Sequence, residues 1–356
     1  MKKKRLRIRP FTIITCLVDL AFIAVLVVIY TPIINFKNFW VTTAMTTMNH
    51  QYLAYTLYSE KDVTKIMNSN YIEEAKEDMN LDDIIIGDNK EKKKYKDEYE
   101  EAIYTRDPDN DVYKIIRLEE KNYKGYLTVV YDPKDVELAV PKRLGKAGTS
   151  VNKLVLDNEG LVGINGGGFE DLDGWGNGSK PYGAIIHNGE LLWDYKDSGG
   201  LIGFTKNHKL WLTTMEPEDA IQQGMNDAVE FGPYLIINGK KANIHGDGGW
   251  GIAPRTAIAQ RKDGIVLFLI IEGRLPGYSI GADLNDVIDL FAKYGAYNAA
   301  NLDGGASSTM SVNGKLYNKP SAGGEYGGRT VSNAWIVTNR TNKKVPEVKT
   351  NEKSRY

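Results

Sequence analysis

From about residue 113 to residue 341, the chain alternates short apolar runs with turn-forming residues. The runs at residues 126–131 and 136–140 predict two strands around an Asp-Pro turn, and residues 265–271 predict a third. The 36 glycines exceed average usage, and helices tolerate glycine poorly. This pattern favours a sheet-rich domain over a helical bundle.

Two Asn-Gly pairs, at residues 188–189 and 238–239, each follow an apolar run. Asn-Gly is the preferred centre of a tight antiparallel hairpin, so we expect a hairpin at each pair. One helix is expected over residues 283–294, where apolar residues recur at helical spacing and Gly295 follows as a left-handed cap. The prediction is an α+β fold, with a mixed, largely antiparallel sheet core and flanking helices.

The N-terminus carries six Lys and Arg residues within residues 1–10, followed by mostly apolar residues from 11 to 30. Twenty helical residues span about 30 Å, the thickness of the hydrocarbon core of a bilayer. We therefore expect a single-pass cell-membrane anchor over residues 11–34, with the basic tail cytoplasmic and the rest extracellular. A cleavable signal peptide is the alternative, although the apolar run is long for one.

The composition of the exported part limits its partners. The only cysteine, Cys16, lies in the apolar run, so no disulfide is expected beyond it. Without the basic tail and Asp19, 39 basic and 45 acidic residues remain, a net charge near −6. That balance argues against a nucleic-acid partner.

Residues 35–112 differ from the rest in texture. Apolar residues at helix-like intervals predict a juxtamembrane helix within residues 39–80. Residues 88–111 are dominated by Lys, Glu and Asp, which indicates a solvated stalk, although such a run could also dock a partner. The catalytic domain is expected at 113–341, followed by a polar tail at 342–356.

The most unusual stretch is NLDGGASSTM at residues 301–310, directly after an expected strand at 296–302. Glycines next to polar residues allow backbone N–H groups to converge on an anion, because no Cβ blocks the approach. The combination of a carboxylate, two glycines and three hydroxyls therefore predicts a binding or catalytic loop. Asp303 could instead merely cap this loop.

Four further stretches share this character. They are NGGGF at 165–169, FGP at 231–233, PRTA at 254–257, and EGR at 272–274 with S-x-G at 279–281. In this order, together with NLDGGASSTM, they resemble the phosphodiester glycosidase family over roughly residues 125–340. Glu272 departs from the resemblance, since Asp is expected there in many relatives, and the departure puts a fixed catalytic role for it in doubt.

The resemblance implies hydrolysis of a sugar 1-phosphodiester, of the N-acetylglucosamine-1-phosphodiester type, at the anomeric C–O bond. Phosphate is a good leaving group that already carries charge, so the site must mainly bind an anion. Charge-assisted donors for that role are Arg255, Arg274 and Arg329. Backbone N–H groups are expected to contribute from Gly166, Gly167, Gly168, Gly304 and Gly305.

A carboxylate must also activate water or attack C1. Asp303 is the first candidate and Glu272 the second, and sequence alone does not separate a base from a nucleophile. Expected hydrogen-bonding groups for sugar or phosphate oxygens are Asn165, Ser307, Ser308 and Thr309. Each arginine could instead form a surface ion pair, and the 165–168 stretch could be a plain turn.

No metal site and no cofactor are predicted. The loop HGDGGW at residues 245–250 could bind substrate or a cation, but no second ligand pair at a recognised spacing accompanies it.

Two classes of function remain. The leading prediction is a membrane-anchored exported hydrolase of sugar-phosphate diesters in cell-envelope glycans such as an exopolysaccharide. The alternative is a noncatalytic module that binds an anionic envelope polysaccharide. A phosphodiesterase that breaks P–O is a third reading, but its expected cluster of metal-binding His and Asp is missing from the sequence.

Overall fold

The computed structural model describes residues 9–31, 35–47, 50–75, 78–87, 94–171, 176–196, 199–323 and 328–346. The basic tail expected at residues 1–10 and the polar tail expected at 342–356 lie mostly outside these ranges.

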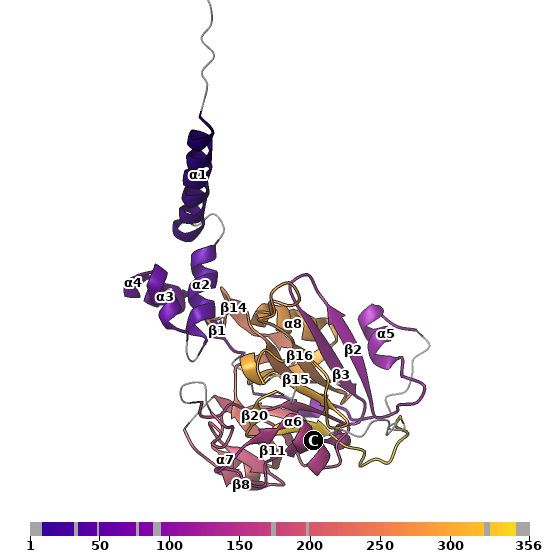
Figure 1. Ribbon diagram of the computed structural model, residues 1–356. Helices are drawn as coiled ribbons and strands as arrows, with labels where there is room; N and C mark the ends of the chain where they lie inside the picture. The colour runs from indigo at the N-terminus through magenta and orange to yellow at the C-terminus, as the bar shows by residue number, and fades with distance from the viewer. Residues whose placement is uncertain are drawn as a thin grey trace, which may run out of the picture.

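The apolar N-terminal run forms α1 (Pro10–Tyr30), none of whose residues is buried. At 1.5 Å per residue its 21 residues measure about 30 Å. Of the helices in the described residues, it is the one long and apolar enough to cross a membrane, a test that a signal sequence also passes. Figure 1 shows α1 projecting away from the rest of the molecule.

Three short helices follow α1, in place of the single helix expected within residues 39–80. They are α2 (Phe36–Met45), α3 (Tyr52–Leu57) and α4 (Glu60–Ser69), packed around a small apolar core that includes Val41, Ala54 and Val63. The expected helix is divided in part because Ser59 begins a new helix, α4, as its N-cap: the Ser59 side chain accepts the Asp62 N–H. With β1 (Tyr71–Glu73), residues 36–73 form what we call the N-terminal helical module.

The expected solvated stalk is wrong for residues 94–112, while residues 88–93 lie outside the described ranges. Helix α5 (Glu98–Tyr104) buries Ile103 and Tyr104 in the main core, and Tyr95 and Tyr99 pack beside them. The helix is amphipathic, so its many charges cover the outside while one face contacts the domain. Figure 1 places α5 alongside β2.

The largest sheet has seven strands and forms the centre of the domain. Their order is β13 (Lys240–Lys241), β12 (Tyr234–Ile237), β17 (Ala296–Leu302), β15 (Arg255–Arg261), β16 (Val266–Ile271), β3 (Lys124–Val130) and β2 (Tyr113–Glu119).

Two five-stranded sheets pack with it around a second apolar core. One has the order β19 (Lys315–Leu316), β18 (Met310–Val312), β6 (Val162–Asn165), β21 (Ala334–Val337) and β4 (Val136–Ala139). The other has the order β10 (Leu210–Thr213), β9 (Gly200–Thr205), β11 (Met225–Phe231), β7 (Ile185–His187) and β8 (Glu190–Trp193).

The remaining elements are short. Two-stranded sheets join β1 to β14 (Asn243–His245) and β20 (Thr330–Val331) to β5 (Thr149–Ser150). Helices α6 (Val151–Asp157) and α7 (Pro217–Gln222) cover the five-stranded sheets. Single 3-10 turns are η2 (Leu81–Asp83), η3 (Pro133–Asp135) and η5 (Gly305–Ser307).

The α+β class is confirmed, but the sheets are not mixed: every strand pair formed by the described residues is antiparallel. The connection from β16 through α8 to β17 makes those two strands parallel in direction. However, β15 lies between them and pairs antiparallel with both. Both expected Asn-Gly hairpins are present, with Asn188 and Asn238 at positive φ.

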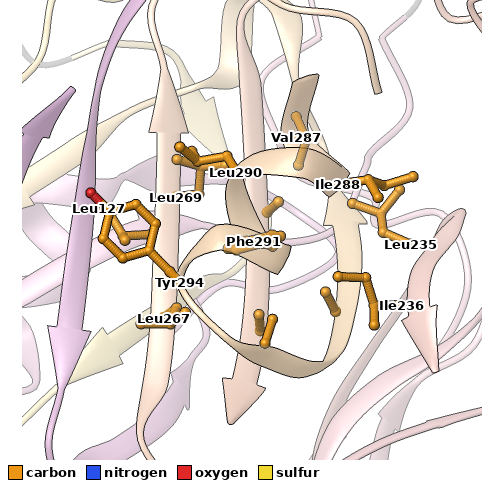
Figure 2. Close-up of a cluster of buried hydrophobic side chains, with 14 of the residues drawn as sticks. Leu127, Leu235, Ile236, Leu267, Leu269, Val287, Ile288, Leu290, Phe291 and Tyr294 are labelled. Carbon is orange, nitrogen blue, oxygen red and sulfur yellow. The ribbon is translucent and has the colours of Figure 1, made fainter. Parts of the chain in front are cut away.

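Helix α8 (Leu284–Lys293) covers one face of the seven-stranded sheet (Figure 2). Asp283 and Asp286 form a capping box at its start, and Gly295 follows its end at φ +74°. Phe291 is fully buried against the sheet. Burial of such side chains, each worth about 1.5–3 kcal/mol, holds the helix against the strands.

Candidate active site

The site lies where several strands begin or end together. Because β15 runs antiparallel to both β16 and β17, its first residue, Arg255, lies opposite Ile271 near the end of β16, and the end of β17 lies on its other side. Glu272 and Asp303 are the residues that follow those two strands. The topology therefore brings three sequence-predicted residues to one edge of the sheet.

Asp303 is half-buried among the loops around it, and the desolvation of its carboxyl group raises the pKa from 3.8 to about 6. The Ser307 hydroxyl and the Gly304 N–H hydrogen-bond to the carboxyl, and the charge of Arg329 acts in the same direction, so these three groups limit the rise. The negative charge of Asp171 adds to it. A carboxyl group with this pKa changes protonation state close to neutral pH, as a catalytic acid or base must.

Arg329 and Asp171 form a salt bridge beside Asp303, with Nη1 and Oδ2 2.8 Å apart. The other oxygen of Asp171 accepts the Gly176 N–H at 2.7 Å, and the Arg329 guanidinium lies over the Phe169 ring at 5.0 Å. Both side chains are thereby held in place. Asp171 was not predicted from the sequence, although it lies only two residues beyond the NGGGF stretch.

The two glycines after Asp303 permit a close approach that no side chain would allow. A Cβ on Gly304 would lie 2.9 Å from the carbonyl oxygen of Pro254. Gly305 adopts φ +59°, and its N–H donates to the same oxygen at 2.9 Å. A Cβ there would lie 3.3 Å from Nη1 of Arg274. Both glycines are therefore needed for the loop to lie against the 254–255 segment and Arg274.

Arg274 is the exposed cation of the site. Its backbone has φ +57°, an uncommon conformation for a residue with a side chain, and burial of part of its guanidinium lowers its pKa. Within the residues that the structure describes, it forms no ion pair. A partly desolvated guanidinium beside Gly305 is well suited to bind a phosphate group.

Asn165 ties the strand ends together. Its Oδ1 accepts the Thr256 hydroxyl at 2.8 Å and the Thr309 N–H at 3.1 Å, while its Nδ2 donates to the Asp303 carbonyl oxygen at 2.6 Å. The side chain is only 1% exposed. Asn165 therefore holds the Asp303 loop in place and is not accessible to bind a substrate directly.

Several expected binding groups are likewise unavailable. Ser308 and Thr309 are 1% and 0% exposed, because both lie in the polar cluster around Thr256 and Asn165. The N–H groups of Gly166 and Gly167 donate to the backbone and side chain of Asn333, so neither is free for an anion. Gly168 packs against the Phe231 ring instead, where a Cβ would lie 2.9 Å away.

Arg255 is buried, in contrast to the exposed binding role expected for it. It is 3% exposed, burial lowers its pKa to about 10, and its Nε and Nη2 atoms donate to carbonyl oxygens of Ala282, Trp250 and Gly251. Its guanidinium therefore fixes neighbouring loops.

Glu272 is also buried, at 1% exposure, and accepts the Lys319 N–H at 2.6 Å. The pKa of Tyr278 is raised to about 12, first by the burial of Tyr278 and then by its hydrogen bond to Glu272 and the negative charge of Glu272. A carboxyl group this buried is not accessible to a substrate in this structure, which weighs against Glu272 as the second catalytic candidate.

The predicted residues gathered around the Asp303 loop are thus Arg274, Arg329, Ser307 and the Gly304–Gly305 turn, with Asp171 added. Arg274 is exposed, and Asp303 and Arg329 are half-buried. Ser307 and Asp171 are buried and act through their effect on the Asp303 carboxyl. Across the described ranges, no three His, Cys, Asp or Glu side chains lie close enough together to hold a metal ion.

Comparison with known proteins identifies the class. The family model described as phosphodiester glycosidase matches residues 158–338, half of the chain, so the chain belongs to the phosphodiester glycosidase family. This confirms the resemblance found in the sequence motifs.

Similar proteins include one bacterial protein and one vertebrate enzyme domain. The SPbeta prophage-derived uncharacterized protein YomE of Bacillus subtilis (strain 168) is 29% identical over 205 residues, which make up 53% of this chain and 30% of YomE. The chain therefore spans less than a third of that relative. The catalytic domain of zebrafish N-acetylglucosamine-1-phosphodiester alpha-N-acetylglucosaminidase, auto-inhibited by its pro-peptide, matches with a TM-score of 0.53 and 21% identity, over 67% of this chain and 86% of that chain. At this identity the match shows a shared fold.

Proposed function

We propose that the chain is a membrane-anchored exported hydrolase that cleaves the C1–O bond of sugar 1-phosphodiesters in cell-envelope glycans. The observation that carries the proposal is the environment of Asp303: a carboxyl group with a pKa of about 6 lies in a glycine loop beside an exposed guanidinium that has no ion-pair partner among the described residues. Membership of the family and the activity in the name of the zebrafish relative support the same reaction.

The reaction needs two things from the protein. Arg274 binds the phosphate, and its positive charge stabilises the phosphomonoester as the C1–O electron pair moves onto the leaving oxygen. Asp303 accepts a proton from the attacking water while the water oxygen bonds to C1, which has oxocarbenium character at that stage. A pKa of about 6 suits a base better than a nucleophile, because a base operates best near the working pH.

Burial raises the pKa of Asp303, and Ser307, Arg329 and Asp171 adjust it. The Ser307 hydroxyl and the Arg329 charge stabilise its ionised form, and Asp171 opposes that effect. The salt bridge with Asp171 holds the Arg329 guanidinium in place, close enough for its positive charge to act on Asp303.

The anchor follows from α1 and the charges before it. A helix of 21 mostly apolar residues preceded by six cations supports an orientation with the N-terminus in the cytoplasm and the catalytic domain outside the cell. Envelope glycans joined by phosphodiesters are the substrates that such a domain would encounter.

The test is turnover by the full chain in detergent micelles. We expect release of N-acetylglucosamine and a phosphomonoester from an α-N-acetylglucosamine-1-phosphodiester, and loss of both products with Asp303→Asn. Measurable binding of several sugar phosphodiesters without hydrolysis of any of them would overturn the enzyme assignment and favour a binding module.

A further inference from the structure

One glycine-rich loop lies between the N-terminal helical module and the candidate active site. It comprises residues 245–251, with the sequence HGDGGWG, and we call it the bridging loop. It follows β14, which pairs with β1 of the module, and it precedes β15, which begins at Arg255. Figure 1 shows β1 and β14 together between the module and the domain.

Asp247 is the residue of this loop that faces the module. Its Oδ2 is in hydrogen-bond contact with the Thr42 hydroxyl, and its N–H donates to Asn70 Oδ1 at 3.0 Å. The Thr42 hydroxyl also lies 2.9 Å from the Asn38 carbonyl oxygen. We assign its single proton to the carboxylate, which is the stronger acceptor.

Asn70 is itself fixed within the module. Its Nδ2 donates to the Ile66 carbonyl oxygen at 2.7 Å and to Asn38 Oδ1 at 2.9 Å. The adjacent Tyr71 stacks on His245 with ring centroids 4.2 Å apart and an angle of 11° between the planes. The bridging loop is therefore held by α2, by the end of α4 and by β1.

Two glycines allow this close contact. A Cβ on Gly246 would lie 1.9 Å from Asn70 Oδ1, and a Cβ on Gly251 would lie 2.8 Å from the Cα of Thr43. Both residues also adopt positive φ, at 65° and 58°. A side chain at either position would push the module away from the loop.

The other end of the bridging loop reaches the site. The carbonyl oxygens of Trp250 and Gly251 accept hydrogen bonds from Arg255 Nη2. The residue before Arg255, Pro254, accepts the Gly305 N–H at 2.9 Å. A continuous set of contacts therefore runs from Thr42 through Asp247 and Arg255 to the turn that follows Asp303.

We propose that Asp247 is a positioning residue through which the N-terminal helical module fixes Arg255 and the Asp303–Gly305 loop. The module is then a working part of the enzyme and not a spacer between membrane and domain. This inference rests on the proposed function, because it assigns the module a role in the same site. Displacement of a reacting group by about 1 Å can lower a rate as much as a hundredfold, so such support matters for turnover.

The experiment compares Thr42→Val with Thr56→Val in the full chain. Thr42→Val removes the hydroxyl bonded to Asp247 and keeps the branched shape. Thr56 lies in α3 of the same module, and among the residues that the structure describes its hydroxyl bonds to the Leu53 carbonyl oxygen alone, at 2.7 Å. We expect kcat/KM for a sugar 1-phosphodiester to fall about tenfold with Thr42→Val, to recover with Thr42→Ser, and to be unchanged with Thr56→Val.

A double-mutant cycle tests whether the effect passes through Asp247. Combining Thr42→Val with Asp247→Ala should cost no more than the more damaging single change, because each change removes the hydrogen bond between the two side chains. If the losses of kcat/KM in the two single variants multiply in the double variant, the proposal is overturned. Equal losses with Thr42→Val and Thr56→Val would overturn it as well.

Hydrogen exchange separates this inference from the proposed function. If the module fixes the loop, the Trp250 and Gly305 amides should exchange faster in Thr42→Val than in Thr56→Val, whether or not the chain hydrolyses the substrate. Unchanged exchange at both amides would overturn the coupling even in an active enzyme. A lack of turnover by the unaltered chain would instead overturn the proposed function alone.

Discussion

Arg329 and Asp171 form a salt bridge of 2.8 Å whose two charges act in opposite directions on Asp303. The positive charge of Arg329 lowers the pKa of Asp303, and the negative charge of Asp171 raises it. Burial is the main cause of the raised pKa of Asp303, and the two charges of the pair adjust that pKa in opposite directions.

Opposite shifts of the pH profile follow from this relationship. Because the ionised form of Asp303 is the base, kcat/KM should rise with pH through about 6. Arg329→Gln should move this limb to higher pH, and Asp171→Asn should move it to lower pH. Profiles of kcat/KM between pH 4 and pH 8 measure both shifts. Movement of both variants in the same direction would contradict the assignment of Asp303 as the titrating group.

Asp303→Asn should abolish turnover and stabilise the fold at neutral pH. A folded-state pKa raised from 3.8 to about 6 means that folding favours the protonated carboxyl. That contribution is fully present below pH 3.8 and is lost as the pH rises through about 6. The variant avoids the loss, so its free energy of unfolding at pH 7.5 should exceed that of the unaltered chain by about 1–3 kcal/mol.

Thermal or urea unfolding at pH 4 and pH 7.5 measures this difference, which should nearly vanish at pH 4. Asp157→Asn is the matched control, because Asp157 lies in an exposed ion pair with Lys153 at 2.8 Å and should change stability little. An Asp303→Asn protein that is less stable than the unaltered chain at pH 7.5 would argue against a raised pKa.

Arg274→Gln should weaken binding of phosphodiesters without affecting the fold. Removal of a charge-assisted donor should raise KM about tenfold, and the dependence of KM on ionic strength should decrease. Arg117→Gln provides the control, since Arg117 is exposed and paired with Glu119 at 2.7 Å on β2. Equal KM values for the two variants would remove Arg274 from phosphate binding.

Asn165→Ala should affect stability and activity together. The change leaves the Thr256 hydroxyl, the Thr309 N–H and the Asp303 carbonyl oxygen without their partner in a buried region. We expect a loss of about 2–4 kcal/mol in the free energy of unfolding, measured in urea. Asn158→Ala, which removes one hydrogen bond at the end of α6, should cost no more than about 1 kcal/mol. Comparable losses would show that the network is not cooperative.

Elements governed by local sequence were predictable. The helix at 283–294 and the Asn-Gly hairpins depend on spacing, caps and turn residues that lie within a few positions of one another. The charged run before residue 113 led to the incorrect prediction of a solvated stalk, because its charged residues outnumber the few apolar residues that pack against the core. The spacing of Tyr95, Tyr99 and Ile103, close to a helical repeat, was the available sign of a buried face.

The site was only partly predictable, because burial is set by long-range pairing. The sequence motifs pointed to Asp303 and the glycines after it. They could not show that Arg255 and Glu272 are buried, because arginine and glutamate also serve as exposed binding groups. Their side chains become buried only when β15 and β16 pair and the loops cover their ends. Asp171 follows no recognisable spacing, and its role appears only once Arg329, distant in sequence, lies beside it.

The central claim, cleavage at C1–O, is tested most directly by hydrolysis in ¹⁸O-labelled water. The full chain in detergent micelles is incubated with an α-N-acetylglucosamine-1-phosphodiester, and the phosphomonoester product is examined by mass spectrometry, because its oxygens do not exchange with water under these conditions. We predict a phosphomonoester without label and labelled N-acetylglucosamine in rapidly quenched samples. Label in the phosphomonoester would show P–O cleavage and contradict the account.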